Sequence, residues 1–200
     1  MGFSDLRHFI RVYDQHLDAT ICGRMIESFA ELEQFQRPNG RGIRAGFDES
    51  AWTELNVTKL SDPTFLRNFR AVIDQALERY NQDVGLTIRL PNSFVIADLV
   101  MKRYRSGHEE RFQLHFDAIH QVANRYLVFL WYLNDVASGG ETRFPQLQYT
   151  VPARVGRLLM FPPYWMYQHE GIPPQSGEKF ILSTYLLFTA STAEGASEAG

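Results

Sequence analysis

The stretch YLVFLWYLNDVASGGETRFP, residues 126–145, joins a run of apolar residues to a turn rich in small and polar residues. The run has the length of one buried strand, and the two glycines supply the positive φ angles that a tight turn needs. Three further short apolar or alternating runs occupy residues 93–104, 154–161 and 180–188. Glycine and proline separate these runs, and no segment of helix length lies between them. The pattern predicts an antiparallel sandwich or barrel rather than a parallel α/β sheet.

The first part of the chain has a different pattern, which predicts mostly helix up to about residue 90. Apolar residues recur at helical spacing from Asp18 onward, and again after Asp62, where Pro63 suits the first helical position. A short strand is possible at residues 9–13, and the Gly- and Pro-rich segment 36–46 is expected to be a loop. The fold class is therefore mainly β with flanking helices (α+β), with the helices packed outside the sheets.

Composition narrows the classes of partner and the compartment. The chain has 200 residues, a net charge of −3 and a single cysteine. This charge gives no reason to expect nucleic acid as a partner. One cysteine excludes an internal disulfide, and with no apolar run long enough to span a bilayer it favours a cytoplasmic protein without a membrane partner. The small, polar tail at residues 191–200 is expected to be flexible. Nothing in the sequence indicates an oligomeric state.

A His-x-Asp tripeptide suggests a metal site. On a strand, residues two apart project from the same face, so His115 and Asp117 converge, whereas His120 would face the other way. A third ligand must then come from a distant strand, and His169 is the candidate. Two histidines and one carboxylate with open positions suit non-haem Fe(II), although zinc accepts the same ligands.

Lys179 directly precedes the apolar run at residues 180–188 and is unusual there. One interpretation is a lysine at the start of a strand that reaches solvent. The other is a cation that binds the distal carboxylate of a cosubstrate.

The order of these motifs resembles the Fe(II)- and 2-oxoglutarate-dependent dioxygenases, in particular the prolyl 4-hydroxylase-like branch. His-x-Asp is followed by YLN, GGETRFP, HEG and then Lys179, and the resemblance covers roughly residues 96–188. It implies a double-stranded β-helix, or jelly roll, at about residues 91–189, within a single dioxygenase domain spanning residues 1–190. Val128 departs from the family pattern, because relatives commonly have threonine there.

The resemblance also implies roles for individual residues. It makes His115, Asp117 and His169 the catalytic ligands of Fe(II), and it pairs Lys179 with the C5 carboxylate of 2-oxoglutarate. Three further residues receive less specific roles. Tyr104 matches a tyrosine that helps to bind the same carboxylate, Tyr185 stands where some relatives have a tryptophan near the cosubstrate, and Arg125 matches an arginine at the substrate entrance. Trp165, beside the strand of the distal histidine, is a candidate wall of the substrate site.

The implied reaction uses Fe(II), 2-oxoglutarate and O2 to hydroxylate a C–H bond, and it releases succinate and CO2. The leading substrate is a prolyl residue of a peptide or protein, hydroxylated at C4. The alternative is a free amino acid or a small natural-product intermediate. A jelly-roll binding module without redox activity would need none of the ligands, and a zinc hydrolase would give Lys179 no purpose.

Overall fold

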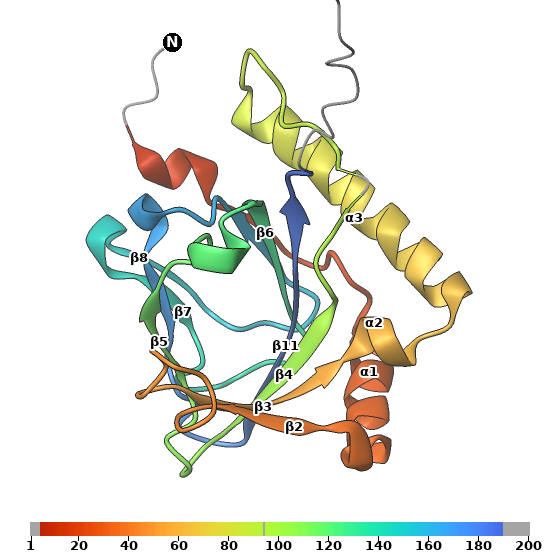
Figure 1. The fold of residues 1–200 in the computed structure, drawn as a ribbon, viewed down its shortest axis with the longest axis vertical. Coiled ribbons are helices and arrows are strands. Elements are labelled where there is room, and N and C mark those ends of the chain that lie inside the picture. Colours follow the sequence, from red (N-terminus) through yellow and green to blue (C-terminus); the bar gives the residue numbers. More distant parts are fainter. Residues whose placement is uncertain (1–4, 94, 190–200) are drawn as a thin grey trace, which may run out of the picture.

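Two antiparallel sheets face each other and form the body of the protein (Figure 1). The computed structural model describes residues 5–93 and 95–189, and the tail predicted at residues 191–200 lies outside them. The seven-stranded sheet has the order β1 (Arg11–Tyr13), β9 (Leu158–Phe161), β6 (Arg125–Tyr132), β11 (Glu178–Leu187), β4 (Val100–Arg105), β3 (Ala51–Asn56) and β2 (Arg37–Gly40). The four-stranded sheet has the order β5 (Phe112–His115), β10 (His169–Gly171), β7 (Thr142–Phe144) and β8 (Tyr149–Val151). This arrangement confirms the predicted mainly β jelly roll.

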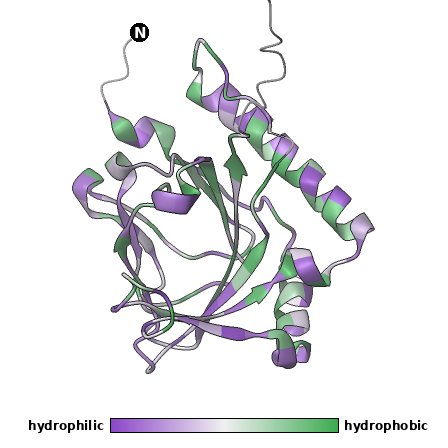
Figure 2. Ribbon diagram, viewed as in Figure 1, coloured by the Kyte–Doolittle hydropathy of each residue, from purple (hydrophilic) through white to green (hydrophobic). Residues whose placement is uncertain are grey.

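The large sheet is buried on both faces, which explains why its strands are almost continuously apolar. On β6, Val128, Leu130 and Tyr132 belong to the cluster that lies against the small sheet. Phe129 and Trp131 alternate with them and belong to the cluster that lies against the helices. Figure 2 shows hydrophobic residues concentrated along these central strands. The sequence run at residues 126–133 is therefore a strand between two layers rather than the wall of an open barrel.

Helices cover the outer face of the large sheet: α1 (Ala19–Glu31), α2 (Val57–Leu60) and α3 (Pro63–Val84) (Figure 1). An aspartate caps each of the two longer helices, because the Asp18 side chain accepts from Thr20 N and the Asp62 side chain accepts from Thr64 N. The buried face of α3 reaches β6 through Phe69, whose ring centroid lies 5.1 Å from that of Trp131. Short 3-10 helices complete the elements: η1 (Leu6–Phe9), η2 (Glu33–Phe35), η3 (His120–Val122), η4 (Pro145–Leu147) and η5 (Trp165–Tyr167).

The first ninety residues are less helical than their composition suggests. The short strand expected at residues 9–13 forms as β1, but β2 and β3 also lie in this region and extend the large sheet past β4. The expected loop at residues 36–46 is wrong for residues 37–40, which form β2. This strand lies at the edge of the sheet, which explains why it has few apolar residues. Proline is tolerated at Pro38 because an edge strand can do without one backbone N–H donor. At its end, Gly40 has a φ of 97°, and a Cβ there would lie 2.2 Å from the carbonyl oxygen of Ser50.

Among the helices of residues 5–93 and 95–189, none is long and apolar enough to cross a membrane.

Candidate active site

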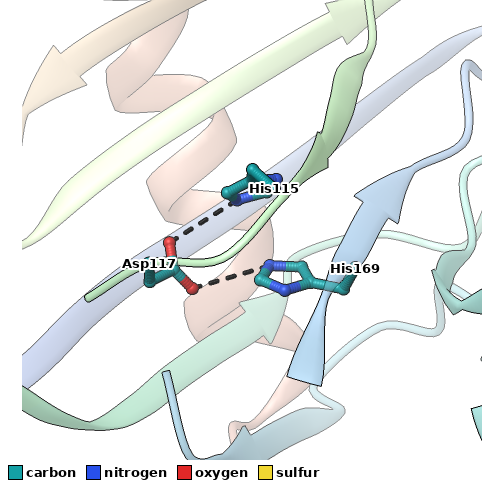
Figure 3. A group of neighbouring side chains, drawn as sticks. All are labelled: His115, Asp117 and His169. Atoms are coloured by element: carbon teal, nitrogen blue, oxygen red, sulfur yellow. Dashed lines mark ion pairs between the residues drawn. The ribbon is translucent and has the colours of Figure 1, made fainter. Parts of the chain in front are cut away.

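Three side chains that are distant in sequence meet between the sheets (Figure 3). His115 ends β5, and His169 begins the neighbouring antiparallel strand β10, where the two residues are paired. The Nε2 atom of His115 lies 3.5 Å from Oδ1 of Asp117, and Nε2 of His169 lies 3.6 Å from Oδ2 of the same carboxylate. The sequence-predicted set of His115, Asp117 and His169 is therefore brought together in one cluster, in which Asp117 and His169 are buried and His115 is partly exposed.

Asp117 reaches this cluster by a turn and not by the strand pleat expected from the sequence. Strand β5 ends at His115, and the chain then bends. The backbone N–H groups of Asp117 and Ala118 both donate to the carbonyl oxygen of Pro163, at 3.0 Å each. The segment before η5 thus fixes the position of the carboxylate. His120 lies further along, exposed on η3, and is not part of the cluster.

The hydrogen bonds of the two imidazoles determine which nitrogen faces the carboxylate. Nδ1 of His115 lies 2.8 Å from the carbonyl oxygen of Gln113, and Nδ1 of His169 lies 3.0 Å from that of Tyr167. A carbonyl oxygen only accepts, so both Nδ1 atoms carry the proton and each Nε2 points toward Asp117. Burial lowers the pKa of His169 to about 4, so this imidazole is neutral near pH 7 and offers a lone pair. Backbone carbonyls that fix the tautomer are typical partners of metal-binding histidines.

The carboxylate of Asp117 stays ionised although too few hydrogen-bond donors surround it. Burial alone would raise the pKa of Asp117, but the adjacent side chains of His115 and His169 and the guanidinium of Arg125 hold it below its usual range. Tyr185 donates to Oδ1 at 2.9 Å, whereas Oδ2 is buried with no hydrogen-bond partner in the described chain. Two imidazole nitrogens and an incompletely paired carboxylate fit a divalent cation, with the donor set expected for non-haem Fe(II).

A small cavity of about 40 Å³ extends from this cluster toward Lys179. Lys179 is 2% exposed, and its Nζ lies 5.4 Å from the ring centroid of Tyr104 and 5.6 Å from that of Tyr132. Burial lowers the pKa of Lys179 to about 7, and Lys102 lowers it further whereas Glu141 raises it. The interpretation of Lys179 as a lysine that reaches solvent is therefore wrong. Its ammonium group lies inside the fold, with no ion-pair partner among the described residues, so it is placed to bind an anion.

A larger cavity of about 470 Å³ adjoins the cluster on its other side and is open, because exposed residues of η3 lie on its rim. Arg125 lines this cavity, donates to the carbonyl oxygen of Asp117 at 3.2 Å and lies 3.8 Å over the ring of Tyr185. Tyr185 lines both cavities. Trp165 does not line either of them and is 65% exposed on η5, so the structure does not bring it into the site.

Sequence reasoning missed several residues of the larger cavity. Trp52, on β3, stacks on Phe112 with a centroid distance of 4.7 Å, and both rings line the cavity. The sequence pattern predicts helix around Trp52, and nothing in that pattern indicates that this side chain lines a cavity. Lys102 also lines both cavities, and it could have been found, because it precedes Tyr104 by two residues and shares its face of β4.

Comparisons with known proteins agree with this geometry. The family model of the 2OG-Fe(II) oxygenase superfamily matches residues 99–187, which run from the start of β4 to the end of β11. No curated protein matches the chain by sequence.

Several solved structures share the fold at low sequence identity. A Pseudomonas putida prolyl-4-hydroxylase is 16% identical with a TM-score of 0.68, and the alignment covers 92% of this chain and 94% of that one. A Trichoplax adhaerens prolyl hydroxylase in complex with a hypoxia-inducible-factor peptide is 14% identical with a TM-score of 0.69, covering 90% and 84%. The viral collagen prolyl hydroxylase of Paramecium bursaria Chlorella virus-1 is 18% identical with a TM-score of 0.58, covering 88% and 94%.

The family match and the shared jelly roll coincide with a cluster that fits Fe(II) and a buried cation beside it. Fe(II), 2-oxoglutarate and O2 are the metal and the two cosubstrates that this family uses. The match to the 2OG-Fe(II) oxygenase superfamily over residues 99–187, together with the shared jelly roll, supports a 2-oxoglutarate-dependent dioxygenase.

Proposed function

We propose that His115, Asp117 and His169 hold Fe(II) and that Lys179 binds the C5 carboxylate of 2-oxoglutarate. The observation that carries the assignment of the ligands is the buried Oδ2 atom of Asp117, which faces Nε2 of His169 with no proton donor between them. Lys102 and Lys179 are the two lysines among the described residues that line the small cavity, and Lys179 is the more deeply buried of the two. Tyr104 lies beside Lys179 and would share the carboxylate.

Within this assignment, the other side chains orient and shield the reacting groups. Tyr185 donates to Asp117 and fixes the rotation of its carboxylate, while Arg125 covers the tyrosine ring. The apolar side chains of Val128, Leu130 and Ile181 line the small cavity and would limit the access of water. Val128, where relatives commonly have threonine, leaves the cosubstrate one polar contact fewer. With the metal bound, 2-oxoglutarate and O2 give succinate, CO2 and one oxygen atom for insertion into a C–H bond.

We further propose that the substrate is a prolyl residue of a peptide or protein, hydroxylated at C4. Two observations support a peptide. The larger cavity opens at the surface beside η3, and a structural neighbour was solved with a peptide fragment bound. The cavity volume of about 470 Å³ also suits a compact molecule, which keeps a free amino acid or a small natural-product intermediate as the second candidate.

The ligand assignment is tested by adding Fe(II) and 2-oxoglutarate without oxygen and recording the charge-transfer absorption of their complex. Oxygen is then admitted and succinate is measured. We expect both signals in the native protein and neither in His115→Ala, because one of the three ligands is lost. His108→Ala is the matched control, since His108 is exposed in the loop between β4 and β5. Normal succinate formation by His115→Ala would refute the ligand set.

The substrate proposal needs a separate experiment. The native enzyme is incubated with proline-containing peptides, with free proline and with other free amino acids, and products are examined for the mass of one added oxygen atom. Oxidation of peptides at proline supports the first candidate. Oxidation of free amino acids alone would instead support the second.

A further inference from the structure

Lys102 is a second interior cation that the proposed chemistry does not use. It lies on β4, opposite Glu54 of β3 and Ile181 of β11, and it faces the space between the two sheets. Its Nζ lies 5.3 Å from the ring centroid of Phe112 and 5.6 Å from that of Trp52. These stacked rings line the larger cavity, so the ammonium group stands where the substrate of the proposed reaction would enter.

The cations of this cavity lack carboxylate partners. Within residues 5–93 and 95–189, no hydrogen bond or ion pair involves the side-chain nitrogen of Lys102. Arg125 donates only to the carbonyl oxygen of Asp117. Arg44 lies 4.6 Å over the ring of Phe47. Each of the three contacts aromatic rings or a neutral oxygen, and none forms an ion pair with a carboxylate of the described residues.

The carboxylates of the cavity already have donors of their own. Glu54 accepts from Trp52 Nε1 at 2.7 Å, and Asp98 accepts from Asn56 Nδ2 at 2.6 Å. With Asp117 reserved for the metal, the lining contains three cations, Arg44, Lys102 and Arg125, against these two carboxylates. Once a metal has taken Asp117, the rest of the lining would have an excess of one positive charge.

The charged side chains around this cavity act on the pKa of Lys102. Burial lowers its pKa, the carboxylates of Glu54 and Asp117 oppose this effect, and the charges of Arg125 and Arg44 add to it. A partly enclosed ammonium group without a counterion is unfavourable, and an incoming anion removes that penalty.

We propose that Lys102, flanked by Arg125 and Arg44, forms a subsite for a carboxylate group on the molecule that is hydroxylated. The proposal rests on the oxygenase function proposed above. The carboxylate would belong either to an acidic residue next to the target proline or to the target's own free carboxyl end. 2-Oxoglutarate is the less suitable occupant. Lys179 already faces its distal end, and Arg44, Glu54, Trp52 and Arg125 line only the larger cavity.

The test measures binding rather than turnover. Protein loaded with Zn²⁺, which has no redox chemistry, and with 2-oxoglutarate is titrated with matched probes by calorimetry. One pair is an N-acetylated, C-amidated peptide with aspartate or asparagine next to proline. The other is N-acetylproline against N-acetylprolinamide. The first pair reports a side-chain carboxylate and the second reports a terminal one.

We expect the native protein to prefer the charged member of one pair by about tenfold or more, as for a charge-assisted hydrogen bond. Lys102→Met should abolish that preference, and Lys102→Arg should restore most of it. Lys59→Met is the matched control, because Lys59 is exposed on α2.

Three results would overturn the subsite: equal affinity of the native protein for both members of each pair, binding of none of the probes, or a preference that survives Lys102→Met. A Lys102→Met variant that loses affinity for 2-oxoglutarate instead would assign the lysine to the cosubstrate. Failure of the oxygenase function itself would appear separately, as native protein that forms no succinate from Fe(II), 2-oxoglutarate and O2.

Discussion

At the scale of single residues, two groups of opposite charge line the small cavity, in an interior that disfavours both. Asp117 stays ionised because His115, His169 and Arg125 surround it, whereas burial brings the pKa of Lys179 down to about 7. The carboxylate is thus ready for a cation at any ordinary pH. The lysine is ready for an anion only while it holds its proton.

This difference predicts a pH dependence for the binding of 2-oxoglutarate. Below pH 7 Lys179 is charged in the free enzyme, and above it the neutral amine must take up a proton before it can pair with a carboxylate. The dissociation constant should therefore rise by about tenfold for each pH unit above 7. Titration calorimetry of the metal-loaded protein between about pH 6 and about pH 9 measures this dissociation constant.

Lys179→Met should bind 2-oxoglutarate roughly 10- to 100-fold more weakly below pH 7, without the slope above it. Lys59→Met should behave like the native protein. If the slope persists in Lys179→Met, another group controls the binding.

At the scale of elements, Gln113 connects the loop at residues 41–50 to β5, the strand that bears His115. The Gln113 side chain donates to the carbonyl oxygen of Gly46 at 2.9 Å and accepts from Glu49 N at 3.0 Å. The backbone carbonyl oxygen of Gln113 accepts from Nδ1 of His115. The loop supplies Arg44 and Phe47 to the larger cavity, so Gln113 connects the cavity wall with the orientation of the ligand.

Replacing this side chain should loosen the loop without removing the metal site. In Gln113→Leu the backbone carbonyl that holds His115 remains, whereas the contacts to Gly46 and Glu49 are lost. We expect faster hydrogen exchange at the amide of Glu49 and unchanged metal affinity. Gln146→Leu, on exposed η4, is the control. Unchanged exchange at Glu49 would show that other contacts hold the loop.

The packing of helix α3 predicts how substitutions in and beyond it change the free energy of unfolding. Ile73 is fully buried against the large sheet, whereas Ile88, just beyond the helix, is 84% exposed. Ile73→Ala should lower the free energy of unfolding by about 2–5 kcal/mol, because it leaves a cavity. Ile88→Ala should change it by less than about 0.5 kcal/mol. Urea denaturation measures both, and equal effects would contradict the packing of α3.

At the scale of the whole molecule, the site joins the two sheets. His115 and His169 belong to the small sheet, while Lys179, Tyr104 and Tyr185 belong to the large one. A metal bound to the first set and a cosubstrate bridging to the second would link the sheets across their interface. Ligand binding should therefore report on the stability of the entire fold.

Thermal unfolding tests this link. Zn²⁺ with 2-oxoglutarate should raise the Tm, because ligand at about 100 times its dissociation constant adds about 2.7 kcal/mol of stability. A chelator should reverse the shift. Asp117→Asn should show little shift, since the amide cannot supply the charge that faces Nε2 of both histidines. An equal shift in Asp117→Asn would place the metal elsewhere.

Much of the fold was predictable because its signals are local. The apolar runs that became β6, β9 and β11 are contiguous in sequence, and Asp18 and Asp62 cap helices through hydrogen bonds within their own turn. Strand β2 was not predictable, because its RPNG sequence has neither apolar residues nor alternation. It is a strand only because β3 lies beside it and pairs with it.

The sequence by itself determined the types and order of the reactive groups: His115 and Asp117, then His169, then Lys179. These residue types and their order resemble one family pattern, and they do not depend on how the backbone folds. Tertiary structure alone decided how they meet. Hydrogen bonds to the Pro163 carbonyl hold Asp117 beside both histidines, and burial between two sheets lowers the pKa of Lys179. The same sheets partly enclose Lys102, which forms no ion pair with the described residues. The physical reason is that charge, desolvation and hydrogen bonding depend on neighbours in space, and residues distant in sequence supply those neighbours.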